Sequence, residues 1–150
     1  MNKWDARFME MAETVGRWSS CYQQGRHIGA VVVRDKRILT TGYNGAPSGL
    51  KSCFEKGECI RKKNNIASGT RHELCYAIHA EQNAIIQAAK LGVSLDGATL
   101  YCTHQPCGIC TKLIINAGIA RVVYKYPYPD DFAKLLFEES DVQVDLFEEL

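Results

Sequence analysis

Hydrophobic residues near the start of the chain recur at the spacing of a helix. They are Trp4, Phe8, Met11, Val15 and Trp18, which are separated alternately by four and three positions. Because an α-helix turns once every 3.6 residues, this spacing places all five side chains on one face. The pattern predicts an amphipathic helix, with both tryptophans packed into the core.

The pattern then changes to that of strands. Residues 28–33 are a continuous apolar run rich in valine, which is typical of a buried strand. Four polar residues separate this run from residues 38–43, which again have β character. Two strands joined by so short a polar segment predict an antiparallel hairpin. Residues 44–49 contain Asn, Gly and Pro and are expected to form the loop that follows.

The second half alternates between helical and extended patterns. A helix is expected over residues 79–91, ended by Gly92, and further helices over 108–117 and 131–139. Strands are expected over 98–103, 121–124 and 142–144. With the opening helix and hairpin, this order predicts an α/β fold in which helices cover both faces of a mixed sheet. A length of 150 residues fits one domain, residues 1–150.

Residues 50 to about 76 form a polar insertion between the hairpin and the second helix. A structureless loop of this length is unusual inside a compact domain unless function or a metal orders it. The insertion contains Cys53, Cys59, His72 and Cys75. We return to these side chains below, because thiols and imidazoles are zinc ligands.

The chemistry of the chain is concentrated in two short motifs, His79-Ala80-Glu81 and Pro106-Cys107-Gly108-Ile109-Cys110. Their spacing matches the general signature of zinc deaminases. We expect His79, Cys107 and Cys110 to bind Zn²⁺, because three protein ligands leave a fourth position open for water. Glu81 is the expected catalytic residue, which moves protons between water and the substrate.

Several longer stretches resemble deoxycytidylate deaminases. They are residues 29–33, 42–47, 79–85, 106–110 and 115–119, together with Tyr128-Pro129-Asp130. The resemblance implies a cytidine-deaminase-like three-layer αβα sandwich. It also implies zinc-dependent hydrolysis of dCMP to dUMP and ammonia, a reaction that feeds thymidylate synthesis. The family further suggests a homo-oligomer, possibly a hexamer, activated by dCTP and inhibited by dTTP.

The same resemblance suggests which residues bind the substrate. Asn44 would contact the deoxyribose, while the backbone around Ala80 and the residue Thr103 would hold the cytosine. Tyr128 would lie near the 5′-phosphate, with Arg26 as a further phosphate partner. Some relatives carry a second zinc, and here its candidate ligands are Cys21, Cys53, Cys59, His72 and Cys75. The alternative is that these cysteines are reduced, partly buried thiols.

Composition limits the competing interpretations. The net charge of +1 gives no global field for a polyanion, so we expect no nucleic acid among the partners. No signal segment and no apolar run of about 20 residues is present, and seven cysteines are an odd count, so we expect a cytoplasmic protein without membrane contact. Two alternatives stay open: a tRNA adenosine deaminase-like enzyme, and a non-catalytic zinc-stabilised competence-associated protein.

Overall fold

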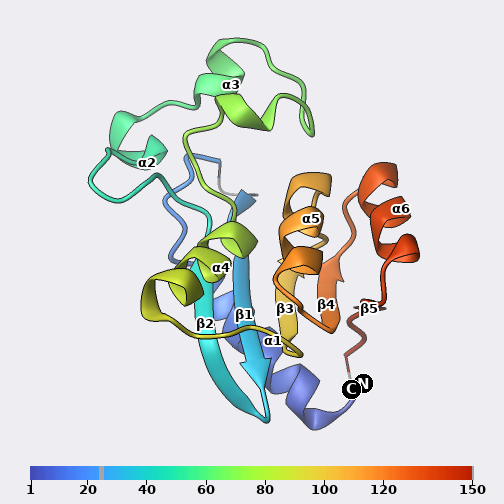
Figure 1. Cartoon of the computed structure of the whole chain (residues 1–150). Coiled ribbons are helices and arrows are strands. Elements are labelled where there is room, and N and C mark those ends of the chain that lie inside the picture. The colour runs from blue at the N-terminus through green and yellow to red at the C-terminus, as the bar shows by residue number, and fades with distance from the viewer. Residues whose placement is uncertain (24–25, 150) are drawn as a thin grey trace.

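The computed structural model describes residues 1–23 and 26–149, whose centre is a mixed five-stranded sheet (Figure 1). The strand order is β2-β1-β3-β4-β5. Strand β1 runs antiparallel to both β2 and β3, whereas β3, β4 and β5 are parallel. The strands are β1 Gly29–Arg34, β2 Arg37–Tyr43, β3 Thr99–His104, β4 Arg121–Tyr126 and β5 Gln143–Leu146. The hairpin and the three later strands are therefore confirmed.

Helices cover both faces of this sheet. Helix α1 (Lys3–Gly16) packs on one face, and α4 (Ala80–Leu91) and α5 (Gly108–Asn116) pack on the other, with α6 (Asp131–Glu139) beside α5 (Figure 1). Side chains alternate across each strand. On β3, Tyr101 joins the cluster under α1, while Leu100 and Cys102 join the cluster under α4 and α5. The predicted three-layer αβα arrangement is confirmed.

The first helix differs from its prediction in its buried face. The helix ends at Gly16, so Trp18 lies outside it with 62% of its surface exposed, and Met11 is 40% exposed. The expectation that both tryptophans lie in the core is wrong, because Trp4 is only partly buried as well. The buried positions of α1 are instead Asp5, Phe8, Met9, Ala12, Val15 and Gly16.

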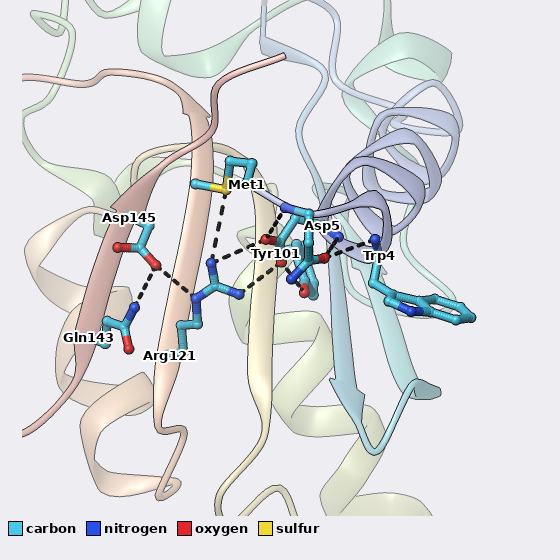
Figure 2. Close-up of polar contacts among 8 residues, drawn as sticks. Met1, Trp4, Asp5, Tyr101, Arg121, Gln143 and Asp145 are labelled. Atoms are coloured by element: carbon cyan, nitrogen blue, oxygen red, sulfur yellow. Dashed lines mark hydrogen bonds and ion pairs between the residues drawn. The ribbon is translucent and has the colours of Figure 1, made fainter. Parts of the chain in front are cut away.

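A buried ion pair ties α1 to the sheet. Arg121 on β4 donates to Asp5 Oδ1 at 2.8 Å and to Asp145 Oδ2 at 2.7 Å (Figure 2). The hydroxyl of Tyr101 on β3 also donates to Asp5 Oδ1, at 2.8 Å. Burial by itself raises the pKa of Asp5, but the hydrogen bonds from Arg121 and Tyr101 outweigh burial and leave this pKa lowered. The carboxylate therefore stays charged inside the fold.

The insertion contains three short helices, α2 (Cys53–Lys56), α3 (Ile60–Lys63) and the 3-10 helix η2 (His72–Leu74). Figure 1 shows α2 and α3 above one end of the sheet, at the top of the view. Ser52 and Glu55 cap α2 reciprocally, which satisfies backbone N–H groups at the helix start. None of the described helices is both long and apolar enough to cross a membrane.

Candidate active site

Two helices begin at the same place above the sheet. His79 is the N-cap residue of α4, and Cys107 is the N-cap residue of α5, which follows β3. Strand β2 supports α4 through Gly42, where a Cβ atom would lie 2.2 Å from the Ala80 carbonyl oxygen. Only glycine permits this approach, so a larger residue there would push the start of α4 away. The sheet thus sets the distance between the two helix N-termini.

The three predicted metal ligands meet between these helix starts. His79 Nδ1 lies 3.2 Å from Cys110 Sγ and 3.5 Å from Cys107 Sγ, and the three atoms are within 4.8 Å of one another. Zinc bound tetrahedrally to one nitrogen and two sulfurs would place nitrogen and sulfur about 3.5 Å apart. The two thiols and one imidazole therefore fit zinc both in spacing and in chemistry.

The two thiols are electrostatically coupled. The Cys110 thiol donates a hydrogen bond to Cys107, which lowers the pKa of Cys107 to about 4 despite burial. The same bond, together with burial, raises the pKa of Cys110. A lowered pKa favours the thiolate form of Cys107, which is the form that binds zinc. The place of Cys107 at a helix N-terminus favours the same charge, because the backbone N–H groups there carry partial positive charge.

Glu81 lies in the first turn of α4, beside the ligand group. Only 4% of its surface is exposed, and burial raises its pKa. The buried thiols of Cys102 and Cys110 lie beside its carboxylate, whose negative charge contributes to raising the pKa of both thiols. A carboxyl group with a raised pKa and a fixed position is suited to accept a proton and to give it back.

A cavity of about 280 Å³ opens onto this carboxylate. We call the part lined by His79 and the buried Glu81 and Cys107 its inner end, and the part lined by Arg26 and Tyr128 its outer end. Arg26, Arg61, Ser68 and Tyr128 also line the cavity. The size suits a small molecule that carries a reactive group near the metal ligands and an anionic group among the cations.

Comparison with known proteins identifies the family. The sequence profile of the cytidine and deoxycytidylate deaminase zinc-binding region matches residues 2–126. The chain belongs to this family.

Individual relatives agree with this assignment. The deoxycytidylate deaminase of Schizosaccharomyces pombe is 38% identical over 94% of this chain, which spans only 43% of that protein. ComE operon protein 2 of Bacillus subtilis is 39% identical over 97% of this chain and 71% of its own length. The dCMP deaminase of cyanophage S-TIM5, solved in complex with dCMP and dUMP, is 32% identical. Its structure covers 98% of this chain and 99% of its own, with a TM-score of 0.78.

Membership of this zinc-binding family confirms zinc as the expected metal. Asn44 lines the cavity but its amide also ties two loops together. Its Oδ1 accepts from the Ile28 amide at 2.9 Å, and its Nδ2 donates to the Arg26 carbonyl. Ala80 is fully buried at the start of α4. The Thr103 hydroxyl accepts from the Gly29 amide and bonds with His104, so its side chain has internal partners.

The two residues predicted near the phosphate lie together at the cavity. Arg26 Nη2 donates to Ser68 Oγ at 2.6 Å, which joins the α1–β1 loop to the insertion. The Tyr128 hydroxyl lies against Gly69, where a Cβ atom would be 2.6 Å away. The φ of Gly69, +78°, also favours glycine. Insertion residues therefore touch both predicted phosphate contacts.

The candidates for a second zinc divide into two groups. Cys21, Cys53 and Cys59 are buried, and burial raises the pKa of Cys21 and Cys53, with a further contribution from the charge of nearby Cys75. Within residues 1–23 and 26–149, the His79 group alone brings three such ligand atoms within 4.8 Å of one another. His72 lines the same cavity as Cys21 and Cys75, and its ring meets the His79 ring edge-on with centroids 5.2 Å apart.

Sequence reasoning missed Arg61 and Ser68. Arg61 stands in the basic run Arg61-Lys62-Lys63, which suggests a solvated loop, yet it is only 4% exposed. Cys102 was also missed as a neighbour of Glu81. Because side chains alternate along a strand, the position of Cys102 next to Tyr101 on β3 indicates that Cys102 faces α4 and α5. The alternation does not indicate which residue of these helices it meets.

Proposed function

We propose that this protein is a zinc-dependent hydrolase that converts dCMP to dUMP and ammonia. The observation that carries the proposal is the grouping of His79, Cys107 and Cys110 beside the buried Glu81, at the inner end of a nucleotide-sized cavity. The naming of relatives as deoxycytidylate deaminases, and the solved relative with dCMP and dUMP, support this substrate. A purely structural zinc site would not need Glu81.

Each residue at the inner end has a distinct task. When bound, zinc would lower the pKa of a coordinated water and so supply the nucleophile. Glu81 would accept a proton from the attacking water at its carboxylate and deliver it to N3 of the cytosine ring, while the water oxygen bonds to C4. Glu81 would then carry the proton of the new C4 hydroxyl to the amino group, so that the C4–N bond breaks, ammonia leaves and the C4 carbonyl of dUMP forms. The buried thiol of Cys102 lies beside this carboxylate on the sheet side.

The outer end of the cavity supports a monophosphate. Arg26 and Tyr128 line the cavity beside Ser68. Charge-assisted hydrogen bonds to a phosphate are about twice as strong as neutral ones, and they would fix the base over Glu81. Asn44, Ala80 and Thr103 keep their proposed roles at the sugar and base.

Ammonia release by the purified protein tests the substrate. We expect dCMP to be converted efficiently, and deoxycytidine, cytidine, dCTP and tRNA to be poor substrates. Equal efficiency on dCMP and deoxycytidine would contradict the assignment to a monophosphate. Preferential turnover of tRNA would favour the adenosine deaminase alternative. Absence of ammonia from every substrate, in protein that contains zinc, would favour a non-catalytic role.

A second, structural zinc remains part of the proposal for the insertion. Its best-supported ligands are Cys21, Cys53, Cys59 and Cys75, because these thiols influence one another electrostatically whereas His72 lies against His79. Elemental analysis should give two zinc ions per chain, and Cys75→Ala should remove one and lower the melting temperature. A stoichiometry of one, with the catalytic site full, would identify these residues as ordinary thiols.

Assembly, regulation and location complete the proposal. We propose a cytoplasmic homo-oligomer, possibly a hexamer, that dCTP activates and dTTP inhibits. Exposed apolar side chains support self-association: Trp18, Phe54 and Leu91 are each at least 62% exposed. Seven free cysteines support a reducing compartment. Light scattering with and without each nucleotide tests the assembly and its regulation.

A further inference from the structure

Arg61 is a buried cation inside the insertion. Its guanidinium donates to the backbone carbonyls of Ala67 at 2.9 Å, Arg71 at 2.7 Å and Thr70. Among the described residues, its side chain forms no ion pair with a carboxylate. A buried charge is costly unless it is hydrogen-bonded or paired. Here carbonyl oxygens satisfy the donors, but the positive charge itself stays uncompensated.

These three bonds shape the loop of residues 67–71, which we call the anchored loop. The loop carries Ser68, which accepts from Arg26, and Gly69, which packs on the Tyr128 hydroxyl. The Ala67 carbonyl also accepts from Thr70, and the Arg71 carbonyl also accepts from the Leu74 amide. Without Arg61 the loop would keep these turn bonds but would lose its attachment to α3, and with it its fixed path. Both contacts of the loop with the predicted phosphate residues depend on that path.

The charge of Arg61 also reaches the same end of the cavity. Arg61, Arg26 and Tyr128 all line it. Burial raises the pKa of Tyr128, as do the negative charges of Cys107 and Asp130, whereas the positive charges of Arg26 and Arg61 act in the opposite direction. Two cations at one end of a cavity attract an anion strongly where water is partly excluded.

We propose that Arg61 is a specificity-determining positioning residue, which builds the phosphate-binding end of the cavity through the anchored loop and supplies part of its positive potential. This inference rests on the proposed function for the identity of the anion. It assigns to the insertion a role in substrate choice. Discrimination between a nucleoside monophosphate and its nucleoside should then depend on a residue that lies outside both zinc motifs.

The test uses the product pair dUMP and deoxyuridine, whose binding needs no turnover. Isothermal calorimetry on the zinc-loaded full chain should show that the wild type binds dUMP more tightly. Arg61→Gln should reduce the ratio of the two dissociation constants at least about tenfold, since it removes a charge from the phosphate end. Arg61→Lys keeps the charge but lacks the forked guanidinium that reaches three carbonyls. Its preference for dUMP should therefore lie between that of the wild type and that of Arg61→Gln.

Lys62→Gln is the matched control, because it removes the same charge from the neighbouring, exposed position of α3. It should keep the wild-type preference. Zinc content and melting curves confirm that each variant is folded. The proposal is overturned if Arg61→Gln weakens the binding of dUMP and of deoxyuridine by the same factor. It is also overturned if Lys62→Gln lowers the preference for dUMP as much as Arg61→Gln does.

A misfolded Arg61→Gln leaves Arg61→Lys as the deciding variant, where an unchanged preference overturns the proposal and a reduced one supports it. A wild type that does not distinguish dUMP from deoxyuridine also overturns it. A wild type that prefers dUMP but releases no ammonia from dCMP would refute the proposed reaction while supporting this role of Arg61.

Discussion

The two faces of strand β3 carry two buried polar clusters with opposite character. Under α1, Tyr101 and Arg121 bind the Asp5 carboxylate, and every charge has an opposite partner (Figure 2). Under α4 and α5, Glu81 lies beside the thiols of Cys102 and Cys110, and burial raises its pKa despite the opposing charge of His79. The first cluster is satisfied and stabilises the fold. The second needs a metal and a substrate to be complete, which is typical of a catalytic centre.

Of the substitutions that test this contrast between the two clusters, Glu81→Gln should have the largest effect. Glu81→Gln keeps the shape and hydrogen bonding of the side chain, but the amide cannot accept a proton. We expect kcat to fall by about 10²-fold or more while zinc content is unchanged. Ammonia release and elemental analysis on the same sample measure both. Glu138→Gln, at an exposed position, is the control. Wild-type turnover by Glu81→Gln with full zinc would exclude its proposed role.

Removal of a thiol should disturb the metal and the reaction together. Cys107→Ser and Cys110→Ser replace a thiolate by a hydroxyl, which is a poor zinc ligand. Zinc content and activity should therefore fall in the same proportion across preparations. A variant that retained one tightly bound zinc and normal activity would remove that cysteine from the ligand set.

A substitution in the Asp5 cluster should lower the stability of the fold and leave catalysis unchanged. Asp5→Asn leaves Arg121 without one partner in a mostly buried site, so we expect the free energy of unfolding at pH 7 to fall by about 3 kcal/mol. The kcat of the folded variant should be unchanged. Urea denaturation measures the loss, and Asp141→Asn, at an exposed position, is the control. A large loss of kcat in folded, zinc-loaded Asp5→Asn would mean that the two clusters are coupled.

The same variant should change how stability depends on pH. The pKa of Asp5 is lowered in the folded chain from its ordinary 3.8, so the unfolded chain binds the proton more readily. The stability that Asp5 contributes is therefore complete above pH 3.8 and is lost as the pH falls through the lower folded value. The difference between wild type and Asp5→Asn should shrink only below about pH 4. A difference that instead shrank near pH 6 would point to another group.

Local patterns predicted most of the fold, and contacts between distant segments account for what was missed. The hairpin, α4 and α6 follow from periodicity and from turn residues, and α6 begins and ends at the predicted residues. Asp5 could not be recognised as buried, because its partner Arg121 is 116 positions away. Arg61 resembles its exposed neighbours in sequence and differs only because the anchored loop folds over it.

The zinc motif could be predicted because two local spacings, each at a helix start, carry the whole ligand set. The cavity could not, because its outer end combines the α1–β1 loop, the insertion and the segment after β4. His72 shows the same limit, because the sequence does not reveal that its ring meets that of His79. Metal ligands are specified locally, whereas substrate contacts depend on how loops meet.

The smallest expected effect concerns Tyr128, whose hydroxyl lies against the anchored loop at Gly69. Tyr128→Phe removes one neutral hydrogen-bonding group and leaves the ring. Because one hydrogen bond to a charged group contributes about 1.5 kcal/mol at the low end of its range, kcat/KM for dCMP should fall about tenfold. The poor reaction with deoxycytidine should hardly change, since that substrate has no phosphate. Tyr124→Phe, on β4, serves as the control. Equal losses on dCMP and deoxycytidine would assign Tyr128 to packing rather than to the phosphate, and the outer end of the cavity would then depend on Arg26 and the anchored loop.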